Sequence, residues 1–222
     1  MIRLGTRIFW ATATLSMTLG CWADDTHFWA TFNTNGYHLN GNWKTASHLQ
    51  VRSPEFEFLQ YGRFSQKFLR VAGDKWTLGA HPAIEFKRSA PGDSWDNDYR
   101  IEVEASGNFK LNSGPTLSTR SRWEFRVKDG SGSDVFHRVR QQFKATWKRE
   151  GLGPIDSYTL ANETFYELDQ GQIVANRFFP LSVGFKTAGG LKTGAYLMYL
   201  SQRSKSTDDW SGFYVVGMDF KF

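Results

Sequence analysis

The sequence predicts an all-β fold, namely an antiparallel up-and-down transmembrane β-barrel of 10–12 strands. Apolar and polar residues alternate along most of the chain, as they do in strands with one wet face and one apolar face. Several of these runs are 11 to 14 residues long, whereas soluble strands average about 5–6 residues and tilted membrane strands need about 9–11. The chain also ends on an alternating segment whose last residue is Phe222.

Residues 1–23 are predicted to be a secretory signal peptide. Arg3 and Arg7 provide the positive start, residues 8–19 are mostly apolar, and Ala23 is a small residue at the expected cleavage site. The alternative is a lipoprotein signal at Cys21, but Thr18 stands where such signals have Leu. We expect export and cleavage after residue 23, which leaves residues 24–222 as a single outer-membrane β-barrel domain without a cysteine.

Residues 26–39 allow two interpretations. Phe28, Ala30 and Phe32 alternate like a strand, but an eleventh strand would place the N-terminus on the wrong side of an antiparallel barrel. The segment is therefore expected either to form a hairpin at Asn35 and Gly36, which gives twelve strands, or to lie outside the wall. The strand number stays open between ten and twelve.

The first half of the wall contains five expected strands, one of which carries a proline. The segment 76–87 places Trp76 and Ile84 on its apolar face and His81 and Glu85 on its polar face. Pro82 lacks an N–H group for the ladder, so a bulge or another irregularity is expected there. The five strands are expected at residues 43–52, 63–71, 76–87, 99–105 and 117–128.

The second half contains five more expected strands. Arg177 shares its parity with apolar Phe179, so a shift of register at a bulge is expected in that strand. In the last strand, Tyr214 and Val216 alternate with polar positions such as Asp219. Short turns at 72–75, 112–115 and 187–190 alternate with more polar connections at 89–97, 129–134 and 203–209, which is typical of outer-membrane barrels. The five strands are expected at residues 138–148, 157–167, 172–186, 191–202 and 210–222.

The charged residues are predicted to line the interior. The chain has 27 basic and 22 acidic residues, but they alternate with apolar residues along strands and form no basic stripe, so nucleic acid is not an expected partner. Unpaired charges in a dry core would cost several kcal/mol each. We therefore expect a lumen-facing charged ladder formed by Arg100, Glu102, Glu104, Arg120, Arg122, Glu124, Arg126, Arg138, Arg140, Lys144 and Glu163, to which Arg177 is a further candidate.

Two interpretations of this ladder remain open. Its ion pairs could fill the interior and hold the barrel shut, or its excess of Arg could line a narrow channel for small anionic solutes. Barrel size does not decide between them, because about eight strands leave a filled interior and about sixteen leave a pore.

No pattern in the sequence indicates catalysis, a metal or a cofactor. The five histidines have no helical i, i+4 spacing, and no cysteine remains in the mature chain to join them. Neither a G-x-S-x-G elbow nor a phosphate-binding glycine motif is present. We expect no enzymatic role, no metal and no cofactor, and we keep an outer-membrane lipid-modifying enzyme with Ser and His residues as an alternative.

The spacing of strand residues resembles the DUF2490 family, whose members are predicted outer-membrane barrels. The resemblance implies a location and a fold, and it implies no reaction. Its closing residues Gly217, Phe220 and Phe222 are similar to the C-terminal assembly signal of outer-membrane barrels, although Val215 departs from the usual polar residue. The matching pieces are Trp29, Trp43, residues 49–52, 120–126, 138–140 and 162–165, Asn176, Arg177, Gly184, Phe185 and residues 217–222.

Together these observations predict an integral outer-membrane barrel that acts as a narrow passive channel or as a structural wall protein. Its expected partners are outer-membrane lipid, the barrel-assembly machinery and, for the channel, small anionic solutes. Trp123, Phe125, Val216 and Phe220 are then expected to face lipid while the arginines face the lumen. A soluble periplasmic barrel that binds an apolar ligand is the remaining alternative, and it would turn the apolar face inward.

Overall fold

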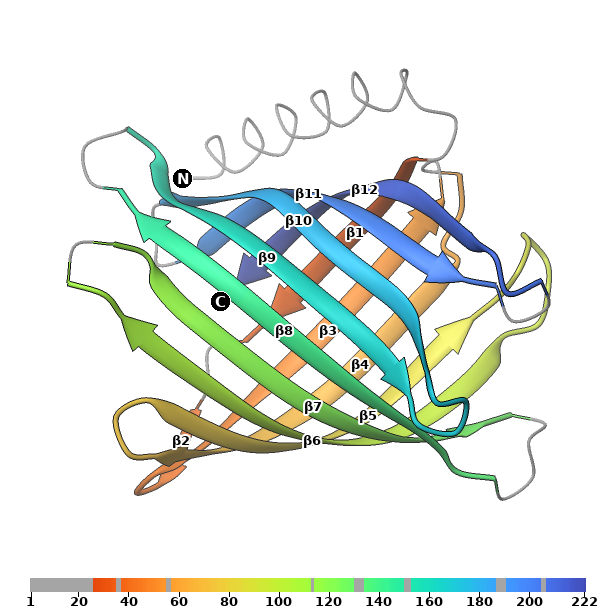
Figure 1. Cartoon of the computed structure of the whole chain (residues 1–222), viewed down its shortest axis with the longest axis horizontal. Helices are drawn as coiled ribbons and strands as arrows, with labels where there is room; N and C mark the ends of the chain where they lie inside the picture. The colour runs from red at the N-terminus through yellow and green to blue at the C-terminus, as the bar shows by residue number, and fades with distance from the viewer. Residues whose placement is uncertain are drawn as a thin grey trace, which may run out of the picture.

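The computed structural model is a closed all-β barrel (Figure 1). It describes residues 26–34, 37–54, 57–112, 114–129, 134–149, 153–186, 191–204 and 207–222. Within these ranges, no helix is long and apolar enough to cross a membrane. The predicted signal peptide (1–23) and the predicted turn at 187–190 lie outside the described residues.

All ten strands predicted between residue 43 and the C-terminus are confirmed. Most boundaries agree within a few residues, but β6 is much longer than the expected 99–105, because Gly107 continues the strand where the alternation of polar and apolar residues fades. The ring of Trp76, on the adjacent strand, would lie 3.0 Å from a Cβ at Gly107, so glycine leaves room for this cross-strand contact. The strands are β1 (Thr26–Asn33), β2 (Tyr37–Asn40), β3 (Trp43–Pro54), β4 (Tyr61–Ala72), β5 (Trp76–Lys87), β6 (Asp96–Lys110), β7 (Thr116–Lys128), β8 (Phe136–Lys148), β9 (Ile155–Glu167), β10 (Gln172–Lys186), β11 (Lys192–Arg203) and β12 (Trp210–Lys221).

The N-terminal strand closes the barrel in a way that the sequence did not suggest. β1 pairs with β3 in the antiparallel direction and with β12 in the parallel direction, so that β1 and β3 to β12 form a ring of eleven strands. The objection to an eleventh strand assumed antiparallel pairing throughout, and the parallel seam removes it. In Figure 1, β1 lies between β12 and β3.

β2 continues the line of β1 along the same neighbour. Both β1 and β2 run antiparallel to β3, so they point the same way and are not the two arms of a hairpin. The alternative of a hairpin at Asn35 and Gly36 is therefore wrong, although these two residues themselves lie outside the described ranges. The other alternative, a segment outside the wall, is also wrong, because β1 pairs with β3 and β12 within the ring. The chain instead reverses at Gly41, where a positive φ of 50° suits glycine.

Pro82 and Pro180, which lie in the interior of strands, have different effects. At Pro82 the ladder between β5 and β4 lacks two pairs and then resumes in the same register, so the irregularity is an interruption rather than a bulge. Pro180 lies where β10 shifts register against both of its neighbours, which confirms the bulge expected in this strand. Because of that bulge, Arg177 and Phe179 point inward, whereas Leu181 is exposed on the outer face.

The wall reverses the usual placement of side chains, because its outer face is apolar and its interior is charged. On β7, Trp123 is 43% exposed, whereas its neighbours Arg122 and Glu124 are buried, Glu124 completely. The same alternation places Ile101 outside and Glu102 inside on β6. The predicted assignment of faces is therefore found in the central strands.

One side of the interior is apolar instead of charged. Trp29, Tyr196, Met198, Leu200 and Val215 form a buried cluster contributed by β1, β11 and β12. We call this set the apolar cluster. A Cβ at Gly217 would meet the ring of Tyr196 at 2.0 Å, so a glycine is required where that ring crosses β12.

Candidate functional site

The main feature of the interior is a single connected set of ion pairs, which we call the ion-pair network. It extends across seven neighbouring strands, from Arg63 on β4 to Arg177 on β10. Its described members are Arg63, His81, Glu85, Lys87, Asp98, Arg100, Glu102, Glu104, Arg120, Arg122, Glu124, Arg126, Arg138, Arg140, Glu163, Glu167 and Arg177.

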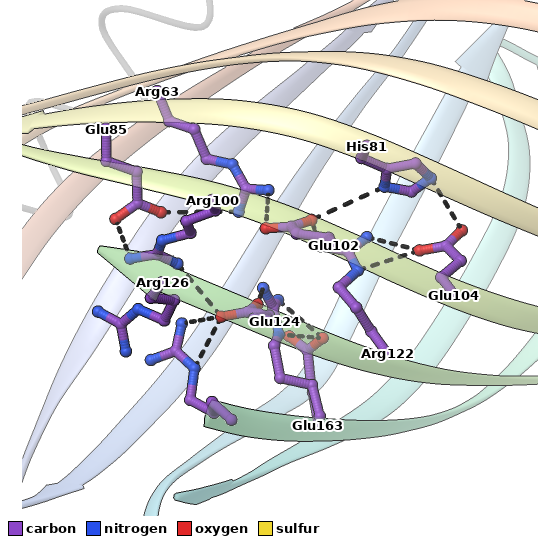
Figure 2. Close-up of polar contacts among 12 residues, drawn as sticks. Arg63, His81, Glu85, Arg100, Glu102, Glu104, Arg122, Glu124, Arg126 and Glu163 are labelled. Atoms are coloured by element: carbon purple, nitrogen blue, oxygen red, sulfur yellow. Dashed lines mark hydrogen bonds and ion pairs between the residues drawn. The ribbon is translucent and has the colours of Figure 1, made fainter. Parts of the chain in front are cut away.

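Glu124 lies near the centre of this network (Figure 2). Its carboxylate contacts Arg138 at 2.5 Å, Arg140 at 2.8 Å and Arg100 at 3.3 Å, all measured from nitrogen to oxygen. The three arginines come from both neighbouring strands, β6 and β8. Since water does not reach Glu124, these guanidinium groups take the place of its hydration.

Glu163 is a second carboxylate shared by three arginines. Arg120 and Arg140 each place a nitrogen 2.8 Å from its Oε1, and Arg177 lies 3.4 Å from its Oε2. Arg120 reaches Glu163 from β7 across β8, so the contact goes through the interior and not along the wall. Such contacts tie strands together that share no backbone hydrogen bonds.

Glu102 connects Arg63 on β4 with Arg122 on β7. Arg63 donates to its Oε1 at 2.5 Å and Arg122 lies 2.9 Å from its Oε2. Arg122 also reaches Glu104 at 2.7 Å. His81, which is completely buried, lies 3.7 Å from Glu102 and 4.0 Å from Glu104 (Figure 2).

Asp98 anchors the part of the network near the first residues of β6. It accepts hydrogen bonds from Arg100 at 2.9 Å and from Arg126 at 2.8 Å. Arg100 also pairs with Glu85 on β5, and Arg126 reaches Glu167 on β9 at 3.5 Å. Near the first residues of β6, the ion-pair network therefore also extends from β5 to β9.

The network contains more cations than carboxylates. Arg63, Lys87, Arg100, Arg120, Arg122, Arg126, Arg138, Arg140 and Arg177 face Glu85, Asp98, Glu102, Glu104, Glu124, Glu163 and Glu167, which are nine cations and seven carboxylates. Several carboxylates are therefore shared, and the interior carries a positive balance among the described residues.

The structure brings ten of the eleven predicted ladder residues into the ion-pair network. The exception is Lys144, which is exposed and makes no ion pair among the described residues. On β8, Lys144 lies on the same face as Arg138 but six residues later, nearer the end of the strand. Arg177, named only as a further candidate, is a member.

Some members were missed by the analysis of the sequence. His81 and Glu85 had been placed on a polar face but were not joined to the ladder, although the cross-strand register brings Glu85 next to Asp98. Arg63 lies in a strand with weak alternation, and no local signal connects it with Glu102, which is two strands away. The remaining residues that were missed are Lys87, Asp98 and Glu167.

Aromatic rings connect the arginines of the ion-pair network with the opposite wall of the barrel. Arg140 and Arg177 both lie with their guanidinium carbon 4.6 Å from the ring centre of Phe165. Arg177 also lies 4.9 Å from the ring centre of Trp29 on β1, a strand that is separated from β10 by β11 and β12. These contacts cross the interior and join the network to the apolar cluster.

One row of side chains resembles parts of a hydrolase but lacks a required contact. Asn33, His48 and Ser65 are direct cross-strand neighbours on β1, β3 and β4, and His48 Nδ1 lies 2.8 Å from Asn33 Oδ1. Ser65 Oγ is buried and has no hydrogen-bond partner among the described residues. The nucleophile–base hydrogen bond that a Ser–His pair needs is therefore not made.

Two other features bear on possible chemistry. A pocket of about 590 Å³ lies on the outer face beside Pro82, and its lining includes Phe64, Tyr99, Ile101 and Phe125. In the described part of the chain, no group of three or more His, Cys, Asp or Glu side chains is arranged to hold a metal ion. Neither feature brings a nucleophile, a base and an open cleft together.

A comparison with protein families agrees with the strand pattern. A family model described as "Protein of unknown function (DUF2490)" matches residues 26–211, which is most of the chain. No curated protein matches the chain.

Proposed function

The chain belongs to the DUF2490 family, and we propose that it is an integral outer-membrane β-barrel whose ion-paired interior makes it a structural wall protein rather than an open pore. The observation that carries the proposal is the reversed alternation of the wall. Trp123 and Ile101 are exposed between the buried charged residues Arg122, Glu124 and Glu102. In water this arrangement would expose large apolar side chains on each of the strands β3 to β12. In a bilayer the apolar outer face would contact lipid, while the charged face would stay inside the barrel.

Strand length and the placement of aromatic residues support a membrane location. The ring strands β3 to β12 have 12 to 15 residues, which is enough for a tilted crossing of the hydrocarbon core. Exposed Trp43, Trp76 and Trp147 lie near strand ends at one rim, and exposed Trp210 and Tyr214 lie near the other rim. Aromatic residues at both rims are typical of barrels that contact two lipid–water interfaces.

The wall role is preferred to the channel role because of the packing in the interior. Glu102 and Glu124 have no exposed surface at all, and Met198 and Val215 on the opposite wall have none either. Charged and apolar side chains thus meet across the interior, where Arg177 contacts Trp29. An enzymatic role receives less support, because Ser65 makes no hydrogen bond to a base.

The reversed alternation also argues against a soluble barrel that binds an apolar ligand. Such a protein would need its apolar side chains in a central cavity, whereas Phe143 and Ile101 point outward and are more than half exposed. The apolar cluster inside is small and filled by its own side chains.

A matched pair of substitutions tests the membrane location. Trp123 lies in the middle of β7 and Trp210 begins β12, and both are exposed on the outer face or its rim. In a bilayer, Trp123→Arg should lower the free energy of unfolding by about 2–4 kcal/mol, whereas Trp210→Arg near the interface should cost about 0–1 kcal/mol. Urea unfolding of the refolded protein in lipid vesicles measures both values.

Equal costs for the two variants would contradict a lipid-facing wall. Extraction of the mature protein without detergent would contradict it independently, since that is the behaviour of a soluble barrel. The wall role has its own test, because planar-bilayer recording should then give no conductance steps with the unmodified protein. Reproducible conductance steps would show instead that the protein acts as a channel.

A further inference from the structure

Four side chains meet where the ion-pair network joins the apolar cluster. Trp29 on β1, Arg52 on β3 and Tyr61 on β4 are direct cross-strand neighbours. Arg177 reaches the same place from β10 through the interior. We call this group the Arg52–Arg177 site.

The rings hold the two guanidinium groups in place. The guanidinium carbon of Arg52 lies 3.9 Å from the ring centre of Trp29 and 3.7 Å from that of Tyr61. That of Arg177 lies 4.9 Å from the ring centre of Trp29. Stacking covers the faces of a guanidinium and leaves its N–H edges free, and these edges are the groups that bind oxyanions in a fork.

Four donor atoms at this site have no partner within the described part of the protein. The indole Nε1 of Trp29, the hydroxyl of Tyr61 and the Nε atoms of Arg52 and Arg177 are all buried without a hydrogen-bond partner among the described residues. Burial of a donor without a partner is costly, so four such donors on neighbouring side chains require an explanation. Apart from the phenol oxygen, none of these groups can accept a hydrogen bond, so a hydrogen-bond acceptor is the complementary partner.

The two arginines at the site also lack carboxylates of their own to balance their positive charges. Of the described carboxylates, none lies within ion-pair distance of Arg52, whose NH2 group donates only to the amide oxygen of Gln50 at 2.8 Å. Arg177 has Glu163 at 3.4 Å but shares it with Arg120 and Arg140. The two guanidinium groups are also close enough to repel each other.

From these contacts we propose that the Arg52–Arg177 site binds a phosphate-type oxyanion. The anion supplies the acceptor atoms that the four donors lack and the negative charge that the two arginines lack. Arg177 retains 15% exposure of its side chain and Arg52 is partly buried, so neither side chain is fully buried. The same chemistry could come from free phosphate or from the headgroup of a phospholipid.

Titration of the refolded full-length protein in neutral detergent micelles tests the site without a membrane. Inorganic phosphate should raise the thermal unfolding midpoint in a saturable manner by about 2–4 °C relative to sodium chloride at the same ionic strength. Arg52→Gln and Arg177→Gln should each weaken phosphate binding at least tenfold by calorimetry. Arg203→Gln, which changes an exposed arginine at the end of β11, serves as the matched control and should bind as the unmodified protein does.

A second arm distinguishes the two sources of the anion. Soluble dihexanoyl phosphatidate that binds at least tenfold tighter than phosphate would identify a lipid headgroup, whereas equal affinity would identify the free anion. Trp29→Phe keeps the ring and removes the indole donor, so it should weaken either ligand while the fold is retained.

If the arginine variants do not fold, the unmodified protein provides the decisive measurement. Phosphate should then protect Arg52 and Arg177 from phenylglyoxal, as mapped by mass spectrometry, while Arg203 is modified at the same rate with and without phosphate. No protection of Arg52 and Arg177, or a midpoint that responds to phosphate and chloride alike, would overturn the proposal. None of these measurements involves a bilayer. A failure of the proposed anion site can therefore be distinguished from a failure of the proposed membrane role.

Discussion

At the scale of single residues, the unusual feature is that neighbours in the sequence have opposite environments. Glu124 is fully buried, whereas Trp123 beside it is 43% exposed. Burial of a carboxylate is costly unless cations replace its hydration. Arg100, Arg138 and Arg140 do so for Glu124, and the stability of the interior therefore depends on complete sets of partners rather than on single pairs.

Removal of one shared carboxylate should show this dependence. Glu124→Gln keeps the size of the side chain but leaves three buried guanidinium groups short of negative charge. We expect the free energy of unfolding to fall by about 3–5 kcal/mol, measured by urea titration in detergent micelles. The matched control is Asp208→Asn, which breaks a surface pair with Arg203 and should cost about 0–1 kcal/mol. Similar costs for the two variants would show that the ion-pair network contributes no more than a surface contact.

At the scale of elements, proline and the parallel seam determine where strands change direction or register. Pro180 cannot donate to a ladder, and the shift beside it moves the inward positions of β10 from odd-numbered to even-numbered residues. β1 meets β12 in parallel register, with Phe32 opposite Phe220 and their rings stacked at 5.1 Å. This seam closes the ring with an odd number of strands.

Cross-linking can verify the direction of the seam. In residues 24–222, which contain no cysteine of their own, cysteines placed at Phe32 and Phe220 should be joined by a short bismaleimide, because these residues are direct partners. Cysteines at Phe32 and Tyr214 should not react with each other, since Tyr214 is the partner of Thr26 at the other end of the seam. The comparison is made by the migration of the unfolded protein on a denaturing gel. Cross-linking of the second pair but not the first would indicate an antiparallel closure.

At the scale of the whole molecule, the interior is divided between charged and apolar halves that meet in the middle. Strands β4 to β10 contribute the ion-pair network, and β1, β11 and β12 contribute the apolar cluster. Trp29 belongs to the cluster and also stacks on Arg52 and Arg177. Its ring therefore connects the two halves of the interior.

Removal of this ring should open the barrel. Trp29→Ala should cost about 3–5 kcal/mol of stability because it leaves a cavity, and it should produce conductance steps in a planar bilayer, where the unmodified protein produces none. Trp43→Ala is the matched control, because Trp43 is exposed at the rim and fills no interior space. If Trp29→Ala folds and remains silent, the ion-pair network alone closes the interior. If Trp43→Ala conducts equally well, the steps do not report on the interior at all.

Local patterns in the sequence were sufficient for the strands and their faces. Alternation along 117–128 and 210–222 depends only on the two-residue period of a strand, so it can be recognised without knowledge of any neighbour. The family resemblance was likewise confirmed, because it depends on the spacing of such strand residues. The expected ladder was found for ten of its residues, since charges on one face of adjacent strands must face the same space.

Contacts between distant strands could not be predicted in this way. No local feature of residues 26–33 distinguishes parallel pairing with β12 from a hairpin, because the choice depends on the geometry of the closed ring. Arg63 joins Glu102, and Arg177 stacks on Trp29, only because the wall curves and brings non-adjacent strands together. The sequence by itself therefore determined the strands and which side chains share a face. The tertiary structure alone decided how the ring closes and which of those side chains meet, because both depend on the curvature and stagger of the complete barrel.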